Sequence, residues 1–214
     1  MNLNDAKKHF PLVVEQANQN FNEISTKYPG VIQQIESMAI ELVDIKLSKN
    51  AKLTMLRKLI DGLNVLIVQN IACSKGCSSC CYMATLTFSI EVENISTQVK
   101  IKPKKFKGIF KNLNDEKLAN IQHTIQGVPC TFLKNNECSI YDIRPLACRL
   151  HHNLSNSPQM CDTSLDSETT CIPKIDLPLF QQAMVIMFGD RGDSMGDIRE
   201  AFPTSAKSIY NSKT

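Results

Sequence analysis

Nine cysteines define the chemistry that this sequence can perform, and none of them lies in the first 72 residues. Four fall within nine positions, in the segment Cys73-Ser74-Lys75-Gly76-Cys77-Ser78-Ser79-Cys80-Cys81. Thiols that are two or three residues apart can converge on a soft metal ion. The spacing therefore predicts a thiolate metal site, to which the later cysteines can contribute: Cys130, Cys138, Cys148, Cys161 and Cys171.

The rest of the sequence favours a metal site over a disulfide framework. The polar start of the chain predicts no secretory signal, and no apolar run is long enough to span a membrane. We therefore expect a cytoplasmic protein, and cytoplasmic thiols stay reduced. The odd number of cysteines also fits a disulfide framework poorly.

The number of thiols limits what the site can hold. A tetrahedral zinc ion or a [4Fe–4S] cluster takes four thiolates, so eight suffice for two centres, or for one centre and a redox pair. Cys80 and Cys81 are adjacent and can serve one centre only if the backbone bends sharply. Otherwise Cys81 serves a second centre or packs. The cations nearest in sequence that could offset thiolate charge are Lys75, Arg144 and Arg149.

Two histidines and one further cysteine are weaker candidates. His151 or His152 could complete a Cys₃His site or act as a base, although a polar pair in a loop is more often exposed. Cys171 has no partner in the pattern and is interpreted as a free thiol. No glycine-rich nucleotide fingerprint and no HExxH motif occurs in the sequence.

The charge gives little support for a nucleic-acid partner. The formal net charge is +3, too small to imply one. One segment, 100–111, carries six lysines and two phenylalanines and could form an anion- or RNA-binding edge. We favour a solvated connector anchored by its phenylalanines, because no nucleic-acid-binding motif occurs elsewhere.

Apolar periodicity predicts the elements that must position these cysteines. Amphipathic helices are expected over 12–26 and from Val31 to Leu66, interrupted near 28–30 and 48–50, and packed on the cysteine region or on a second chain. The remaining predictions are a helix over 90–99 capped by Ser89, a helix over 115–126 capped by Asn114, a hairpin of 129–133 and 137–141, a short helix over 146–149 with Pro145 in its first turn, and a helix over 177–188.

These elements predict a mainly α fold with a small β-hairpin. The expected architecture is a single metal-centred cysteine-cluster domain over 71–190, with an N-terminal helical extension over 1–70 and a C-terminal tail over 191–214. Such a domain is organised around its metal centre rather than around a large sheet.

Taken together, the cysteine segments resemble the YkgJ-like CxxCxxCC family, bacterial proteins described as chelators of zinc or iron. The resemblance covers roughly residues 73–190 and departs from the family name at the three-residue gap between Cys73 and Cys77. The segments that carry it are Ile71–Cys81, Pro129–Leu133, Cys138–Arg149 and Ser157–Asp162.

The resemblance implies a metal-ligand set, with Cys161 as an addition to the motif cysteines. Tyr141 and Arg144 belong to the family string, where packing and charge compensation are the expected roles. Related flagellin lysine N-methylases look like iron–sulfur enzymes that use S-adenosylmethionine. The implied metal residues are Cys73, Cys77, Cys80, Cys81, Cys130, Cys138, Cys148 and Cys161.

Three classes of function follow from the sequence. The first is a protein that holds zinc or an iron–sulfur cluster for structure, storage, sensing or delivery. The second is an iron–sulfur enzyme that modifies a protein side chain such as lysine. The third is a zinc-stabilised module that binds a protein partner through its N-terminal helices. An open coordination position and a pocket would distinguish an enzyme from a closed structural site.

Overall fold

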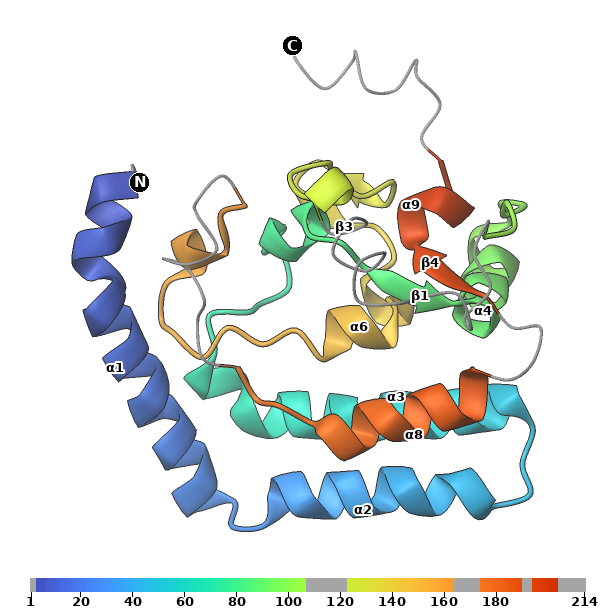
Figure 1. Cartoon of the computed structure of the whole chain (residues 1–214), viewed down its shortest axis with the longest axis horizontal. Coiled ribbons are helices and arrows are strands. Elements are labelled where there is room, and N and C mark those ends of the chain that lie inside the picture. Colours follow the sequence, from blue (N-terminus) through green and yellow to red (C-terminus); the bar gives the residue numbers. More distant parts are fainter. Residues whose placement is uncertain (1–2, 107–122, 164–173, 190–193, 204–214) are drawn as a thin grey trace.

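A computed structural model describes residues 3–106, 123–163, 174–189 and 194–203 (Figure 1). Helices form most of the described elements, and the strands are short pairs, so the prediction of a mainly α fold with a small hairpin is confirmed. In the described residues, no helix is both long enough and apolar enough to cross a membrane.

Three helices make up the N-terminal part: α1 (Leu3–Lys27), α2 (Val31–Asp44) and α3 (Lys49–Ile67). Their junctions lie at the predicted interruptions. Gly30 has φ 75° directly before α2, a conformation that costs glycine little. Ser48 caps α3, because its hydroxyl accepts a hydrogen bond of 3.2 Å from the Ala51 N–H.

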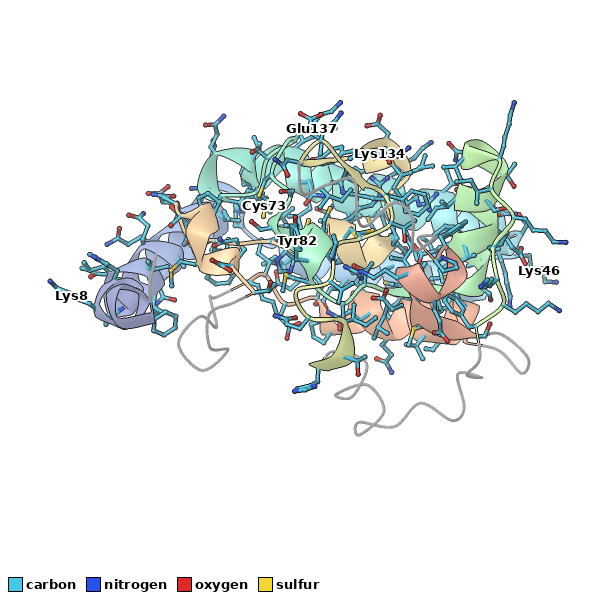
Figure 2. All side chains as sticks on the ribbon, turned by 90° about the horizontal axis from the view of Figure 1, so that it is seen from above. Lys8, Lys46, Cys73, Tyr82, Lys134 and Glu137 are labelled. Atoms are coloured by element: carbon cyan, nitrogen blue, oxygen red, sulfur yellow. The ribbon has the colours of Figure 1, made fainter. Side chains whose placement is uncertain are left out.

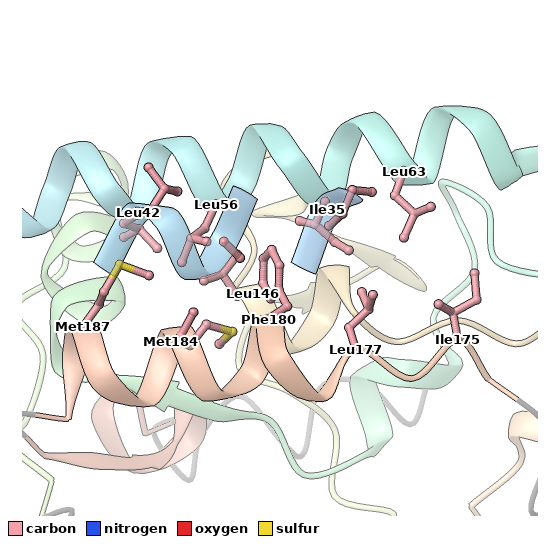
Figure 3. Packing of buried hydrophobic residues seen from close by; sticks show 14 of the residues in the cluster. Ile35, Leu42, Leu56, Leu63, Leu146, Ile175, Leu177, Phe180, Met184 and Met187 are labelled. Carbon is pink, nitrogen blue, oxygen red and sulfur yellow. The ribbon is translucent and has the colours of Figure 1, made fainter. Parts of the chain in front are cut away.

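The main hydrophobic core joins the N-terminal helices to a late helix, α8 (Pro178–Phe188). Figure 3 shows Phe180, Met184 and Met187 of α8 directed toward side chains of α2 and α3. The same buried cluster includes Leu146, which lies in the cysteine motif. The helical extension and the cysteine region therefore share buried apolar contacts.

The cysteine region is built from short elements between and around these helices. In chain order they are η1 (Val68–Asn70), η2 (Ser79–Tyr82), β1 (Leu86–Phe88), α4 (Ser89–Val99), β2 (Leu133–Lys134), β3 (Glu137–Cys138), η4 (Tyr141–Ile143), α6 (Leu146–Arg149), η5 (Pro158–Cys161), β4 (Met195–Asp197) and α9 (Ile198–Ala201).

The predicted hairpin forms, with strands shorter than expected. β2 pairs antiparallel with β3, and Leu133 lies opposite Cys138. Asn135 and Asn136 make the turn with φ of 50° and 60°, as tight hairpins require. A second antiparallel pair, β1 with β4, was not predicted, because its strands are three residues long and lie far apart in the sequence.

Two predicted helix starts differ from the structure. Ser89 is the first residue of α4 rather than its cap, and the Glu91 carboxylate accepts the Phe88 N–H at 3.2 Å. Pro145 lies at the cap position before α6 instead of in its first turn. Glu91 is fully buried and also accepts the Leu146 N–H at 2.8 Å, so it ties α4 to α6.

Some sequence predictions fall where the structure is not described. They include most of the helix expected over 115–126, the end of the lysine-rich segment, Cys171, and residues 191–193 and 204–214 of the expected tail. The described residues 194–203 of that tail include β4 and α9. The described start of the lysine-rich segment agrees with the connector interpretation, because Phe106 is buried in a second hydrophobic cluster.

Candidate metal centre

The eight cysteines predicted as ligands line one cavity of about 360 Å³. All eight are free thiols in the described residues, and Cys81 is the most deeply buried of them. Figure 2 shows Cys73 and Tyr82 in the central part of the molecule, between Lys8 at one end and Lys46 at the other. The cavity is lined by Cys73, Cys77, Cys80, Cys81, Cys130, Cys138, Cys148 and Cys161.

The first cysteine segment folds as a loop that leads into the short helix η2. Gly76 has φ 95°, and the Cys77 N–H donates to the Ser74 carbonyl at 3.1 Å. Cys80 and Cys81 both lie in η2. A 3₁₀ helix has about three residues per turn, so adjacent side chains leave it in different directions. Both nevertheless line the same cavity.

Two later segments bring their cysteines to the same cavity. The Cys130 N–H donates to the Cys81 carbonyl at 2.7 Å, which attaches the segment before the hairpin to η2. Cys138 lies in β3 of the hairpin, and Cys148 lies in α6. The Cys148 sulfur is 3.9 Å from the Thr85 hydroxyl. Residues far apart in the sequence thus supply thiols to one place.

The thiols fall into two groups, which we define by the thiols that influence one another's pKa. The first thiol group consists of Cys73, Cys77 and Cys161. Burial raises the pKa of Cys161 to about 11, and the neighbouring thiols Cys73, Cys77 and Cys80 add to the rise. Asn153 joins this group, because its N–H donates to the Cys73 sulfur and its Nδ2 to the Cys161 sulfur, each at 3.2 Å.

The second thiol group consists of Cys81, Cys130, Cys138 and Cys148. Burial raises the pKa of the Cys148 thiol, and Cys80, Cys130 and Cys138 act in the same direction. Cys80 therefore interacts with members of both groups. In the described part of the chain, no three His, Cys, Asp or Glu side chains stand so that they could hold one metal ion.

Hydrogen bonding from Cys81 makes two thiols of this site acidic in the metal-free protein. It lowers the pKa of Cys138 to about 6 and that of Cys80 to about 7, against burial, which acts to raise both. The Cys81 pKa is raised, because its thiol keeps the shared proton. Thiolates are the nucleophilic form of cysteine, so reactivity should differ sharply across the cavity.

We therefore predict that iodoacetamide alkylates Cys138 first in the metal-free protein. The rate should rise with pH and be half-maximal near pH 6, because the thiol is protonated and unreactive below that pH. Cys148, whose pKa is raised, should stay unmodified throughout. Pulse labelling followed by peptide mass spectrometry gives both rates. Equal labelling of Cys138 and Cys148 at pH 7 would contradict this ordering.

One wall of the cavity is cationic and aromatic. The Arg144 guanidinium carbon lies 3.9 Å from the ring centroid of Tyr141, and the Lys75 Nζ lies 5.8 Å from it. Arg144 favours the thiolate forms of Cys80 and Cys138 electrostatically. These positions agree with the packing and charge-compensating roles expected for Tyr141 and Arg144.

Arg149 lines the cavity but is held by other partners. Its guanidinium forms an ion pair with Asp61 of α3 and donates to the Asp142 carbonyl at 2.6 Å. Its Nε donates to the Arg144 carbonyl at 3.0 Å. Arg149 therefore attaches the cysteine motif to the N-terminal helices.

His151 and His152 also line the cavity, although a pair in a loop was expected to be exposed. His152 is only 3% exposed, and His151 is half-buried. Burial lowers the pKa of both, that of His152 to about 4, so its imidazole is neutral at physiological pH. Among the described residues, His151 Nε2 and His152 Nδ1 are buried without a hydrogen-bond partner.

A buried ion pair that supports two cysteine segments was not predicted from the sequence. Arg199 donates to both carboxylate oxygens of Asp197 at 3.0 Å. Its Nη2 also donates to the carbonyls of Cys81 and Val128, each at 2.8 Å. Arg199 lies 118 residues from Cys81 in the sequence and belongs to no motif, so only the folded chain reveals this contact.

Comparison with known protein families gives one match to this region. Residues 72–171 match the family model CxxCxxCC, described as "Putative zinc- or iron-chelating domain". The chain contains a CxxCxxCC domain. No curated protein and no solved structure matches the chain.

The CxxCxxCC domain includes all nine cysteines and excludes the three N-terminal helices, as the resemblance implied. It ends earlier than the roughly 73–190 expected from the sequence, and α8 lies beyond it. The Asp197–Arg199 pair also lies outside the matched residues. Segments that contact and stabilise the CxxCxxCC domain therefore lie both before and after it in the sequence.

Proposed function

We propose that this chain is a metal-binding protein whose eight cavity cysteines hold zinc or an iron–sulfur cluster as thiolates. The observation that carries the proposal is the arrival of eight free thiols at one cavity from separate segments of the CxxCxxCC domain. Inert buried thiols have no physical reason to gather in this way. Thiolate donors are those that zinc and iron–sulfur clusters select.

The surroundings of the thiols fit such a group. Several thiolates around one centre carry net negative charge, which N–H donors and cations must offset. Asn153 supplies two donors to sulfur, and Arg144 supplies a positive charge. Because the thiols line the cavity without meeting at a point, the proposal requires that metal loading draws them together.

The thiol count matches one or two centres. The second thiol group has four members, enough for a Cys₄ centre, and the first has three. Cys80 interacts with members of both groups, so it could complete the first group or exchange with a member of the second. A bound zinc ion would supply structural cross-linking or Lewis acidity, and a bound cluster would supply electron transfer.

An iron–sulfur enzyme is the second candidate, favoured by the cationic and aromatic wall of the same cavity. Arg144, Tyr141 and Lys75 line the space that the thiols share, whereas a closed structural site needs no such wall. The reaction proposed for such an enzyme, modification of a protein lysine with S-adenosylmethionine, rests on the resemblance to flagellin lysine N-methylases. A zinc-stabilised interaction module, using exposed apolar residues of α1 such as Leu12, is a further alternative.

The test is metal and acid-labile sulfide analysis, with a visible spectrum, on protein purified without oxygen. We expect tightly bound iron with sulfide, or one to two zinc ions per chain. Brown protein with sulfide would support the cluster and justify a test of S-adenosylmethionine binding. Colourless zinc protein would exclude redox chemistry and favour a structural or interaction role. Protein without zinc, iron or sulfide would overturn the proposal.

A further inference from the structure

The first thiol group has three members, with Cys80 shared between the groups, and His152 directly precedes the residue that bonds two of its sulfurs, Asn153. Cys73, Cys77 and Cys161 interact with one another, and structural metal sites are usually four-coordinate. Asn153 donates its backbone N–H to Cys73 and its side chain to Cys161. His152 directly precedes Asn153, so its backbone runs beside these two sulfurs.

A hydrogen-bond chain from α3 fixes the tautomer of His152. Asn64 donates its side-chain N–H to the Arg149 carbonyl at 3.3 Å, which leaves its oxygen to accept. That oxygen lies 2.6 Å from His152 Nε2, so Nε2 carries the proton and donates it. Nδ1 is then an acceptor with a free lone pair.

This free lone pair is buried where it has nothing to bind among the described residues. His152 is 3% exposed, and its Nδ1 has no hydrogen-bond partner in the described part of the chain. Buried polar atoms in folded proteins are nearly always bonded. His152 and Asn64 both line the cavity that contains the thiols. The exception therefore points to a group that occupies the cavity.

We propose that His152 binds a metal ion through Nδ1 and completes a Cys₃His centre with Cys73, Cys77 and Cys161. This inference rests on the proposed metal-binding function and assigns a ligand outside the cysteine motif. A metal-binding histidine commonly donates its other ring N–H to an oxygen acceptor, which orients the ring. Asn64 supplies that acceptor from α3, so the helical extension would help to build the centre.

His151 is the natural control, because it lines the same cavity with an unpartnered Nε2. Unlike His152, it is only half-buried, and no hydrogen bond fixes its tautomer among the described residues. The two neighbours therefore present the same chemical group to the cavity with different degrees of preorganisation.

The experiment is ¹¹³Cd NMR on metal-free full-length protein labelled with ¹⁵N-histidine and loaded with Cd²⁺. We expect one cadmium resonance split by a single ¹⁵N nucleus in the wild type and in His151→Gln. In His152→Gln the splitting should vanish and Cd²⁺ affinity should fall at least tenfold at that site. His152→Cys, which restores a fourth thiolate, should recover Cd²⁺ binding without the splitting. Asn64→Leu should weaken Cd²⁺ binding about 10- to 100-fold while keeping the splitting.

The outcomes separate this inference from the proposed function. Cadmium bound to the wild type with no ¹⁵N splitting would overturn the role of His152 and leave thiolate binding intact. Splitting that persists in His152→Gln and disappears in His151→Gln would assign the ligand to the other histidine and also overturn it. Failure of the wild type to bind Cd²⁺ at all would overturn both. The wild-type spectrum shows whether any histidine binds the metal, and His151→Gln shows which of the two it is even if His152→Gln fails to fold.

Discussion

Replacement of Cys80 with serine is expected to remove at least half of the bound metal and the stability that this metal adds to the CxxCxxCC domain. Cys80 interacts with thiols of both groups, so its loss should disturb either centre. Binding energy at structural thiolate sites is folding energy, about 10–16 kcal/mol for zinc in small domains, which exceeds the stability of most proteins. Metal per chain and thermal unfolding measure the effect.

Cys171→Ser is the matched control for this prediction. The sequence places Cys171 outside the proposed ligand set, so this variant should keep its full metal content and melting temperature. Cys77→Ser and Cys148→Ser, one from each thiol group, should each lose metal. A Cys80→Ser protein with wild-type metal content would show that Cys80 is not a ligand.

Replacement of Arg199 with methionine is expected to destabilise the protein by about 3–5 kcal/mol, because it leaves the Asp197 carboxylate buried without its cation. The variant also loses hydrogen bonds to the carbonyls of Cys81 and Val128, which hold two cysteine segments together. For a chain of this size the melting temperature should fall by roughly 10 °C. Differential scanning calorimetry in the metal-free state isolates this effect.

The control for Arg199→Met is Lys58→Met, which removes a positive charge from an exposed position on α3. That variant should change the melting temperature by less than about 2 °C, because exposed charges contribute little to stability. Arg199→Met should also bind metal more weakly, because the hydrogen bonds that it loses hold the backbone at Cys81 and at Val128, two residues before Cys130. Equal melting temperatures for the two variants would show that the buried pair does not support the fold.

The sequence by itself determined the features of this protein that depend on residues close together along the chain. Apolar periodicity located the N-terminal helices and α8, and the two asparagines Asn135 and Asn136 are typical of the tight turn that forms. Cysteine spacing identified the residues that line the cavity and the family that the matched domain belongs to.

Only the tertiary structure decided how these parts meet. The pairing of β1 with β4, the hydrogen bond from Arg199 to the Cys81 carbonyl and the contact of Asn64 with His152 all join residues more than 80 positions apart. Such contacts have no local period or spacing, because they form when separate segments bury their surfaces together. The division of the thiols into two groups around Cys80 has the same origin. A motif therefore identifies the donors, and packing decides which of them stand together.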